Sequence, residues 1–217
     1  MANKQQIQNA YIDYVLTTGE KPKSVYIFTK ENEMPETEFY NHFGSFSGVE
    51  ESIWTELTEK TIAEIKEQEV WATYSAREKI LSFFYSFMEL LKSKRSFVIY
   101  SVKDIPKGLT TPVIFNGAKE SFLNFASGII NQGLETGELA DRKFLSNRYK
   151  DALWSQYAFI LNFWINDSSA GFEKTDEAIE KGINVTFDLF QRSPIDNLLD
   201  YGKFLARNGG FRNTAKV

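Results

Sequence analysis

The feature that most constrains this 217-residue chain is the spacing of its apolar residues, which recur every three or four positions in nearly every segment. This spacing places apolar side chains along one face of an α-helix. Alternating strand-like runs bounded by hairpin dipeptides do not occur. The pattern therefore predicts an all-α protein. Helices are expected at 4–17, 24–31, 36–42, 46–68, 75–93, 96–104, 112–134, 142–167, 175–192 and 195–206.

The breaks between these helices have a chemical basis. Gly19 is expected to end the first helix, and Ser24 to cap the second, because its hydroxyl can accept a hydrogen bond from a free backbone N–H. Pro35 stands in the first turn of the third helix, where proline is tolerated. Gly171 is expected to separate the last two long helices.

Cysteine is absent from the sequence and His42 is its single histidine. Disulfide bonds, thiolate nucleophiles and cysteine metal sites are therefore excluded. His42 has no second histidine to join it, and Glu33 and Glu36 do not complete a strong ligand spacing. We expect no enzyme activity, no metal and no cofactor. The N-terminus lacks a signal-peptide pattern and no run of 18 apolar residues occurs, so a cytoplasmic location without stable membrane insertion is expected.

The first fifty residues contain the most specific pattern. Val25, Phe28, Met34, Phe39 and Phe43 are spaced so that three short helices can close on one small apolar core. The first helix is expected to supply Ile12, Val15 and Leu16 to that core. A three-helix head is the result.

This pattern resembles the DNA-binding head of the TetR family. The residues that carry the resemblance are Ile7, Ala10, Gly19, Ser24, Val25, Phe28, Met34, Phe39, Tyr40, His42 and Phe43. The string Phe39-Tyr40-Asn41-His42-Phe43 matches the end of that head, and the segment 130–139 looks like the family's turn into its penultimate long helix. The resemblance implies a helix-turn-helix head over residues 1–47 and a ligand-binding and dimerisation body over residues 48–217.

In such a head the third helix enters the major groove of double-stranded DNA, while neighbouring helix starts hold phosphates. The resemblance implies that the DNA contacts are Lys23, Ser24, Thr37, Tyr40, Asn41 and His42. The charge of the head opposes this role, since residues 1–50 hold four lysines, no arginine and seven acidic residues. Glu33 replaces the usual turn glycine, and Glu36 and Glu38 place negative charge beside the contact positions. Because phosphate binding depends on cations, weak DNA binding is expected on electrostatic grounds.

The body is unusually rich in aromatic residues. Aromatic side chains at helical spacing most often form plain core. The resemblance instead implies a cavity for a small apolar or aromatic ligand, flat or lipid-like, with Tyr85, Ser121 and the tyrosines of the cluster as polar groups. The expected ligand-binding residues are Phe83, Phe84, Phe87, Tyr100, Phe115, Phe122, Phe125, Trp154 and Tyr157.

The last two long helices are expected to form a homodimer interface. Residues 153–164 are apolar nearly all round, which in a soluble chain implies burial on more than one face. Residues 178–190 carry two stripes, one with Ile179 and Phe187 and the other with Val185 and Leu189. A four-helix bundle between two copies satisfies both stripes. The expected interface residues are Phe163, Ile179, Gly182, Ile183, Phe187 and Phe190.

Two functions remain open at this point. The nearly complete head motif favours a TetR-type transcriptional regulator whose DNA binding is modulated by a small apolar effector. The acidic head favours a TetR-like protein that has lost DNA binding and binds a lipid or isoprenoid, similar to the TetR-fold lipid-binding protein of coenzyme Q biosynthesis.

Overall fold

The computed structural model describes residues 3–105, 110–142, 145–191, 201–202 and 204–205. All regular elements in this part of the chain are helical, which confirms the all-α prediction. The long helices are α1 (Lys4–Thr18), α4 (Phe46–Lys66), α5 (Ala76–Lys92), α7 (Asn116–Glu135), α8 (Tyr149–Asn166) and α9 (Glu173–Phe190). Three shorter α-helices are α2 (Val25–Glu31), α3 (Glu36–His42) and α6 (Arg95–Val102). The 3₁₀ turns are η1 (Glu69–Thr73), η2 (Val113–Phe115), η3 (Ser146–Arg148) and η4 (Ala170–Phe172).

Helix ends follow the expected capping chemistry. Gly19 ends α1 with a φ of 77°, a left-handed conformation that glycine adopts without steric cost. Ser24 caps α2, since its hydroxyl oxygen accepts a hydrogen bond of 3.2 Å from the N–H of Ile27. Gly171 stands between α8 and α9 with a φ of 63°. The helix expected at 142–167 is wrong at its start, because α8 begins at Tyr149. The helix expected at 195–206 lies mostly outside the described residues.

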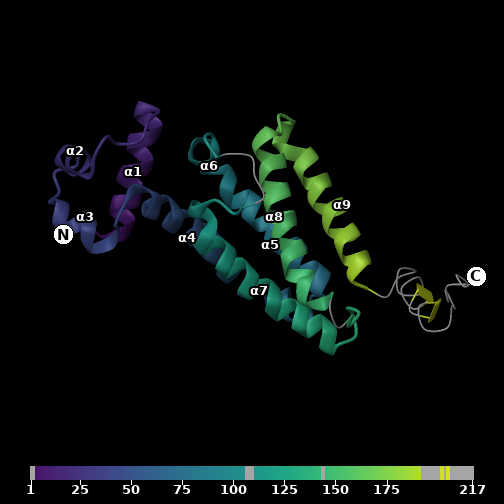
Figure 1. The fold of residues 1–217 in the computed structure, drawn as a ribbon. Coiled ribbons are helices and arrows are strands. Elements are labelled where there is room, and N and C mark those ends of the chain that lie inside the picture. Colours follow the sequence, from purple (N-terminus) through teal and green to yellow (C-terminus); the bar gives the residue numbers. More distant parts are fainter. Residues whose placement is uncertain (1–2, 106–109, 143–144, 192–200, 203, 206–217) are drawn as a thin grey trace, which may run out of the picture.

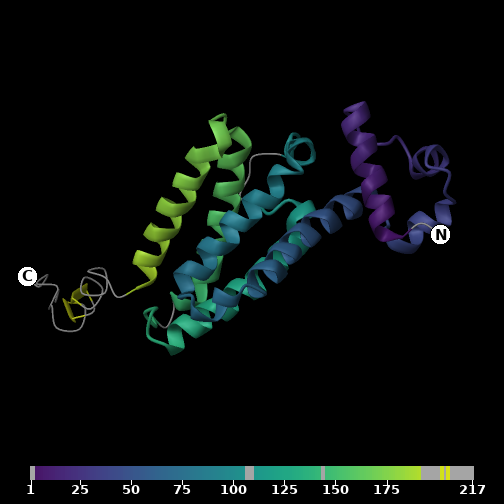
Figure 2. The same cartoon turned by 180° about the vertical axis from the view of Figure 1, so that it is seen from behind.

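The molecule is elongated, with a small head at one end of a helical body (Figure 1). Helices α1 to α3 form the head, and α4 runs from the head into the body without a break. Figure 2 shows α4 and α7 side by side along the body, where they pack closely. Helix α9 packs on α5 and α8. The domain boundary expected after residue 47 falls within α4, which is continuous from Phe46 to Lys66. That boundary stays a prediction.

The head closes on a core of aromatic rings. Phe28 and Phe39 are fully buried, with ring centroids 6.1 Å apart. Phe46, the first residue of α4, lies 5.4 Å from both rings. Leu16 was expected in this core but is 44% exposed, because Tyr11 and Val15 occupy the inward face of α1. The predicted three-helix core is otherwise present, and it extends into α4.

A buried carboxylate joins α1 to α4. The Tyr11 hydroxyl donates a hydrogen bond of 2.7 Å to Glu50, and the Lys21 ammonium lies 2.8 Å from the other carboxylate oxygen. Burial, followed by the hydrogen bond to Glu50, raises the pKa of Tyr11 far above its ordinary value. This contact fixes the start of α4 to the head.

Helix α6 contacts both the head and the turn between α8 and α9. At its C-cap, the Lys103 ammonium donates a hydrogen bond of 2.9 Å to the carbonyl of Gly19 in the head. At its first residue, the Arg95 guanidinium lies 4.5 Å from the ring centroid of Trp164 and 4.4 Å from that of Phe172. The same guanidinium donates to the last carbonyls of α8 and to that of Asp167. One short helix thus joins the head to the α8–α9 turn.

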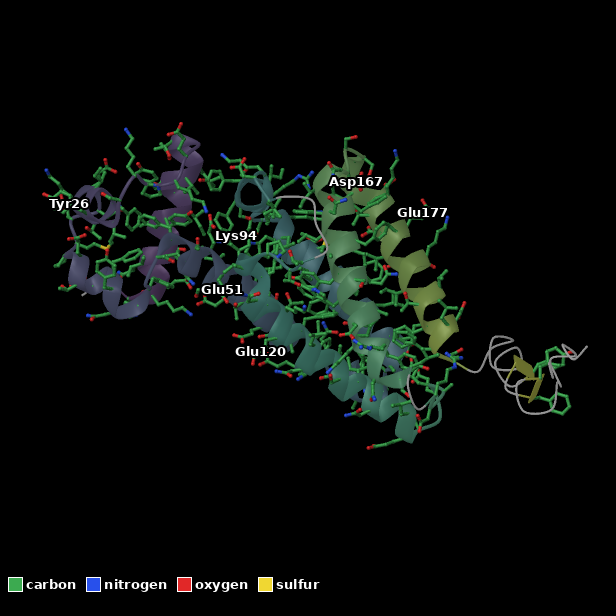
Figure 3. All side chains as sticks on the ribbon, viewed as in Figure 1. Tyr26, Glu51, Lys94, Glu120, Asp167 and Glu177 are labelled. Carbon is green, nitrogen blue, oxygen red and sulfur yellow. The ribbon has the colours of Figure 1, made fainter. Side chains whose placement is uncertain are left out.

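That turn is held by Asp167, which Figure 3 labels between the two helices. Its carboxylate accepts hydrogen bonds from the hydroxyls of Ser169 and Thr175 at 2.6 and 2.7 Å, and from their backbone N–H groups. The Ser169 hydroxyl, followed by the other donors, holds the pKa of Asp167 well below its ordinary value.

None of the helices in the described part of the chain has the length and apolar content that crossing a bilayer requires.

Candidate nucleic-acid interface and ligand-binding region

Helix α3 presents the side chains that the sequence predicts to contact DNA. Thr37, Tyr40, Asn41 and His42 are all exposed, and Tyr40 retains 55% of its accessible surface. Phe39 on the opposite face is fully buried and anchors the helix to the head core. Tyr40 and Asn41 stand three and four positions after Thr37, so both share a helix face with it. Helix α3 is therefore anchored to the head core through Phe39 on one face and exposes polar side chains on the other.

The start of α2 supplies the other two predicted contacts. Lys23 is exposed just before the helix, and Ser24 is its N-cap. The exposed ammonium of Lys23 and the backbone N–H groups at the start of α2 are groups that can meet a phosphate. Tyr26, in the first turn of α2, is 58% exposed and lies at the outer surface of the head (Figure 3).

The turn between α2 and α3 is strained at one residue. Glu33 has a φ of 52°, in the left-handed region that costs a residue with a β-carbon about 1 kcal/mol or more. The turn is still closed, because the N–H of Met34 donates a hydrogen bond of 2.9 Å to the carbonyl of Thr29. The amide of Asn32 also donates to the carbonyl of Phe28. A glutamate therefore occupies a backbone position suited to glycine.

Acidic side chains also gather around α3 in the folded head, which opposes DNA binding. Glu31 and Glu33 are exposed, and Glu36 and Glu38 are half-buried in the first turn of α3. Four carboxylates thus lie next to the predicted contact face, which repels phosphate unless they are offset by cations.

The aromatic residues of the body form a tightly packed cluster. The ring of Phe83 lies 5.0 to 6.2 Å from those of Phe84, Phe87, Phe122, Phe125 and Tyr157. Trp154 is half-buried and stacks on Tyr157 at 4.7 Å. The Tyr157 hydroxyl lies 3.2 Å from that of Thr58, and burial raises the pKa of Tyr157 well above its ordinary value. These rings fill the centre of the body by contacting one another.

Two of the predicted ligand residues lie apart from this cluster. Phe115 contacts Trp54 on α4, with ring centroids 4.7 Å apart. Tyr100 lies on α6, where the Lys103 ammonium is 4.3 Å from its ring centroid. Burial, followed by the charge of Glu50, raises the pKa of Tyr100 to about 12. The nine predicted ligand residues therefore do not form one group.

Two hollows on the described surface are large enough for a small molecule. One, of about 650 Å³, is lined by Glu64, Tyr85, Ser86, Glu89, Leu90, Lys92, Ser93 and Asp176. The other, of about 520 Å³, lies between α4 and α7 and is lined by Glu59, Ile62, Ala63, Lys66, Ser121, Asn124 and Phe125. Phe125 is the one predicted ligand residue that lines either hollow. Sequence reasoning had singled out Ser121 as a polar group, but it missed the groove in which Ser121 lies.

The structure corrects part of the predicted dimer interface. Ile179, Ile183 and Phe187 are fully buried and Phe190 is 5% exposed, because they face α5 and α8 of the same chain. Their side chains have no surface to offer a second copy, so their assignment to the interface is wrong. Phe163 and Gly182 are partly exposed.

The outward surface of α8 and α9 is made by other apolar residues. Phe159 is 53% exposed on α8, and Val185 and Leu189 are 60% and 47% exposed on α9. Val185 and Leu189 belong to the second stripe recognised in the sequence. Large apolar side chains gathered on one helix pair are typical of a surface that another protein covers.

Comparison with known proteins gives an independent measure of this arrangement. A family model described as "Tetracyclin repressor-like, C-terminal domain" matches residues 79–205. The fold is similar to that of a protein from Shewanella sp. PV-4 assigned to the tetR family of transcription regulators, with a TM-score of 0.61 and 13% identity over 89% of this chain and 100% of that chain. It is also similar to a protein of unknown function from Rhodococcus sp. RHA1, with a TM-score of 0.57 and 8% identity over 88% of this chain and 97% of that chain. No curated protein matches the sequence.

Proposed function

Since the chain belongs to the family of tetracyclin repressor-like proteins, with the match on its C-terminal domain, we propose that it is a transcriptional regulator with a DNA-binding head. The family match lies on the body, and similarity to a solved regulator at 13% identity concerns the fold alone. The proposal for the head therefore depends on its own geometry. We further propose that the protein acts in the cytoplasm and has no enzyme activity.

One observation supports DNA binding above the others. Thr37, Tyr40 and Asn41 are exposed together on one face of α3, while the opposite face is anchored by Phe39. A hydroxyl, a phenol and an amide can donate to and accept from base edges in the major groove. We therefore propose that these polar side chains read the DNA sequence in the major groove, and that the head makes few phosphate contacts.

Assembly of two copies is part of this proposal. The contact helices α2 and α3 have seven residues each and offer a small surface, whereas two heads on one dimer can reach successive major grooves. The exposed face with Phe159, Val185 and Leu189 supports a homodimer built on α8 and α9. A small ligand bound by the body would then modulate DNA affinity by shifting the two heads.

The experiment is a binding titration of the purified protein with duplex DNA from the region upstream of its own gene, beside a shuffled duplex of equal composition. Fluorescence anisotropy at several salt concentrations should show preference for the upstream duplex and a shallow salt dependence. The variants Tyr40→Ala and Asn41→Ala should lose the preference, whereas Glu67→Ala, at the far end of α4, should keep it. Equal binding of both duplexes by the unaltered protein, or none to either, contradicts the proposal.

The charge of the head favours a second candidate function. Glu31, Glu33, Glu36 and Glu38 surround the contact face, as in a head no longer required to bind phosphate. In this case the body would bind a lipid or isoprenoid and the head would serve another purpose. Native mass spectrometry of the purified protein distinguishes the two, because a co-purified lipid together with absent DNA binding favours this candidate.

A further inference from the structure

The groove between α4 and α7 contains an unusual set of polar groups. Its apolar lining consists of Ile62, Ala63 and Phe125, and Phe125 is only 6% exposed. Its one carboxylate, that of Glu59, accepts a hydrogen bond of 2.9 Å from the Ser121 hydroxyl. The groove therefore has a partly apolar lining, and the one acid among its lining residues is already hydrogen-bonded.

The two remaining polar groups are available to a ligand. The Lys66 ammonium lies 5.7 Å from the Phe125 ring centroid and makes no ion pair within the described residues. Asn124 is exposed, and its amide makes no hydrogen bond to any described residue. A cation and an amide donor next to an aromatic ring complement an anion attached to a planar apolar group.

We propose that this groove binds a small aromatic carboxylate. The ring of the ligand packs on Ile62, Ala63 and the small part of Phe125 that lines the groove. Its carboxylate pairs with Lys66, and the amide of Asn124 donates a hydrogen bond to it. The volume of about 520 Å³ is within the range of small-molecule sites. This inference rests on the proposed function, since it names the chemical class and the site of the ligand that the body binds.

The position of the groove along α4 allows a bound ligand to influence the head. On the head side of the groove, α4 and α7 are in close contact at Thr55 and Gly117. One helical turn farther along each helix, Glu59 and Ser121 make the first contact of the groove. A ligand between the far halves of these helices would therefore turn α4 about the Thr55–Gly117 contact. The other end of α4 carries Glu50, which is bonded to Tyr11 of the head.

The test uses the full chain and two matched probes, 1-naphthoate and its neutral analogue 1-naphthamide. Isothermal titration should show 1-naphthoate binding in the micromolar range and 1-naphthamide binding about tenfold more weakly, since only the former pairs with a cation. Lys66→Met should weaken 1-naphthoate binding about tenfold and leave 1-naphthamide binding unchanged. Lys60→Met is the matched control, because it removes one positive charge from the same helix outside the groove.

Trp71 provides a second readout, because its ring stacks on Phe125 at 6.0 Å. Its fluorescence should change on addition of 1-naphthoate, and the change should disappear in Trp71→Phe and in the groove-filling variant Ala63→Phe. Both variants can be checked for folding by circular dichroism. Lack of binding by the unaltered protein, or equal affinity in Lys66→Met and Lys60→Met, overturns the proposal. These titrations contain no DNA, so they succeed or fail independently of DNA binding by the head.

Discussion

A β-carbon at residue 117 would lie 2.2 Å from the side-chain oxygen of Thr55, so that only glycine fits where α7 meets α4. No real β-carbon contact is that short. The Thr55 hydroxyl is itself bound, since it donates a hydrogen bond of 2.7 Å to the carbonyl of Glu51. The close approach of α4 and α7 therefore depends on Gly117 and Thr55.

Gly117→Ala should destabilise the protein by about 1–3 kcal/mol, the usual cost of overpacking a tight contact. Gly128→Ala in the same helix is the control, because no atom lies within 4 Å of its added β-carbon. This control should gain about 0.5–1 kcal/mol from helix propensity. Chemical denaturation measures both. If Thr55→Ala fails to recover part of the loss in the Gly117→Ala background, the clash is not the cause.

Val185→Glu should separate the proposed dimer into folded monomers. A buried carboxylate at the centre of an interface costs about 2 kcal/mol or more, which weakens dimerisation at least about thirtyfold. Light scattering and circular dichroism check mass and folding. Val113→Glu is the control and should leave the mass unchanged, because Val113 is 61% exposed on η2, which packs on α4 and α7. By contrast, Phe187→Glu should unfold the chain, since Phe187 is fully buried within its own protomer. An unchanged mass for Val185→Glu places the interface elsewhere.

The double variant Glu36→Lys/Glu38→Lys should bind random duplex DNA more tightly than the unaltered protein. If both lysines meet phosphates, the slope of log affinity against log salt becomes more negative by about 2. Anisotropy titrations at several salt concentrations measure this slope. Glu67→Lys/Glu69→Lys carries the same charge change at the far end of α4 and should have little effect. A similar gain in DNA affinity in both double variants would mean that the net charge of the protein raises the affinity, without docking of the head on DNA.

Glu33→Gly should stabilise the head. Glycine adopts the φ of 52° without steric cost, so a gain of about 1 kcal/mol is expected. Glu33→Ala is the matched variant, because it removes the charge and keeps the β-carbon. Hydrogen exchange of the head amides and thermal denaturation compare the two. Equal gains would assign the effect to charge rather than to backbone strain.

Asp167→Asn should lower stability at neutral pH and remove part of the acid sensitivity. The pKa of Asp167 is lower in the folded chain than its ordinary value of 3.8, so its contribution is present above that pH. As the pH falls below 3.8, protonation removes this contribution from the unaltered protein. The gap between the two proteins should therefore be widest above pH 4 and narrow below it, as denaturation at pH 7 and pH 3 can show. Asp13→Asn, at an exposed residue of α1, should show no such gap.

The helices could be predicted from sequence because their ends depend on local chemistry. Gly19 and Ser24 act within one turn of their own position, and the structure places both as expected. The inward face of α9 could not be predicted, because Ile179 and Val185 belong to two apolar stripes on different sides of the helix. The choice between them is made by α5 and α8, which are distant in sequence. Tyr100 was misplaced for the same reason, since periodicity does not reveal which helix lies opposite.

The two ends of α6 have a consequence for how assembly and head position influence each other. Lys103 ties one end to the carbonyl of Gly19, and Arg95 ties the other to the last carbonyls of α8. A tilt of the head that moves α6 must therefore stretch one of these attachments or shift the α8–α9 turn. If the proposed dimer forms through α8 and α9, any effect of head orientation on dimer formation is matched by an equal effect of dimer formation on head orientation. Weakening either attachment, at Lys103 or at Arg95, should reduce this cooperativity while leaving the dimer contacts and the head core in place.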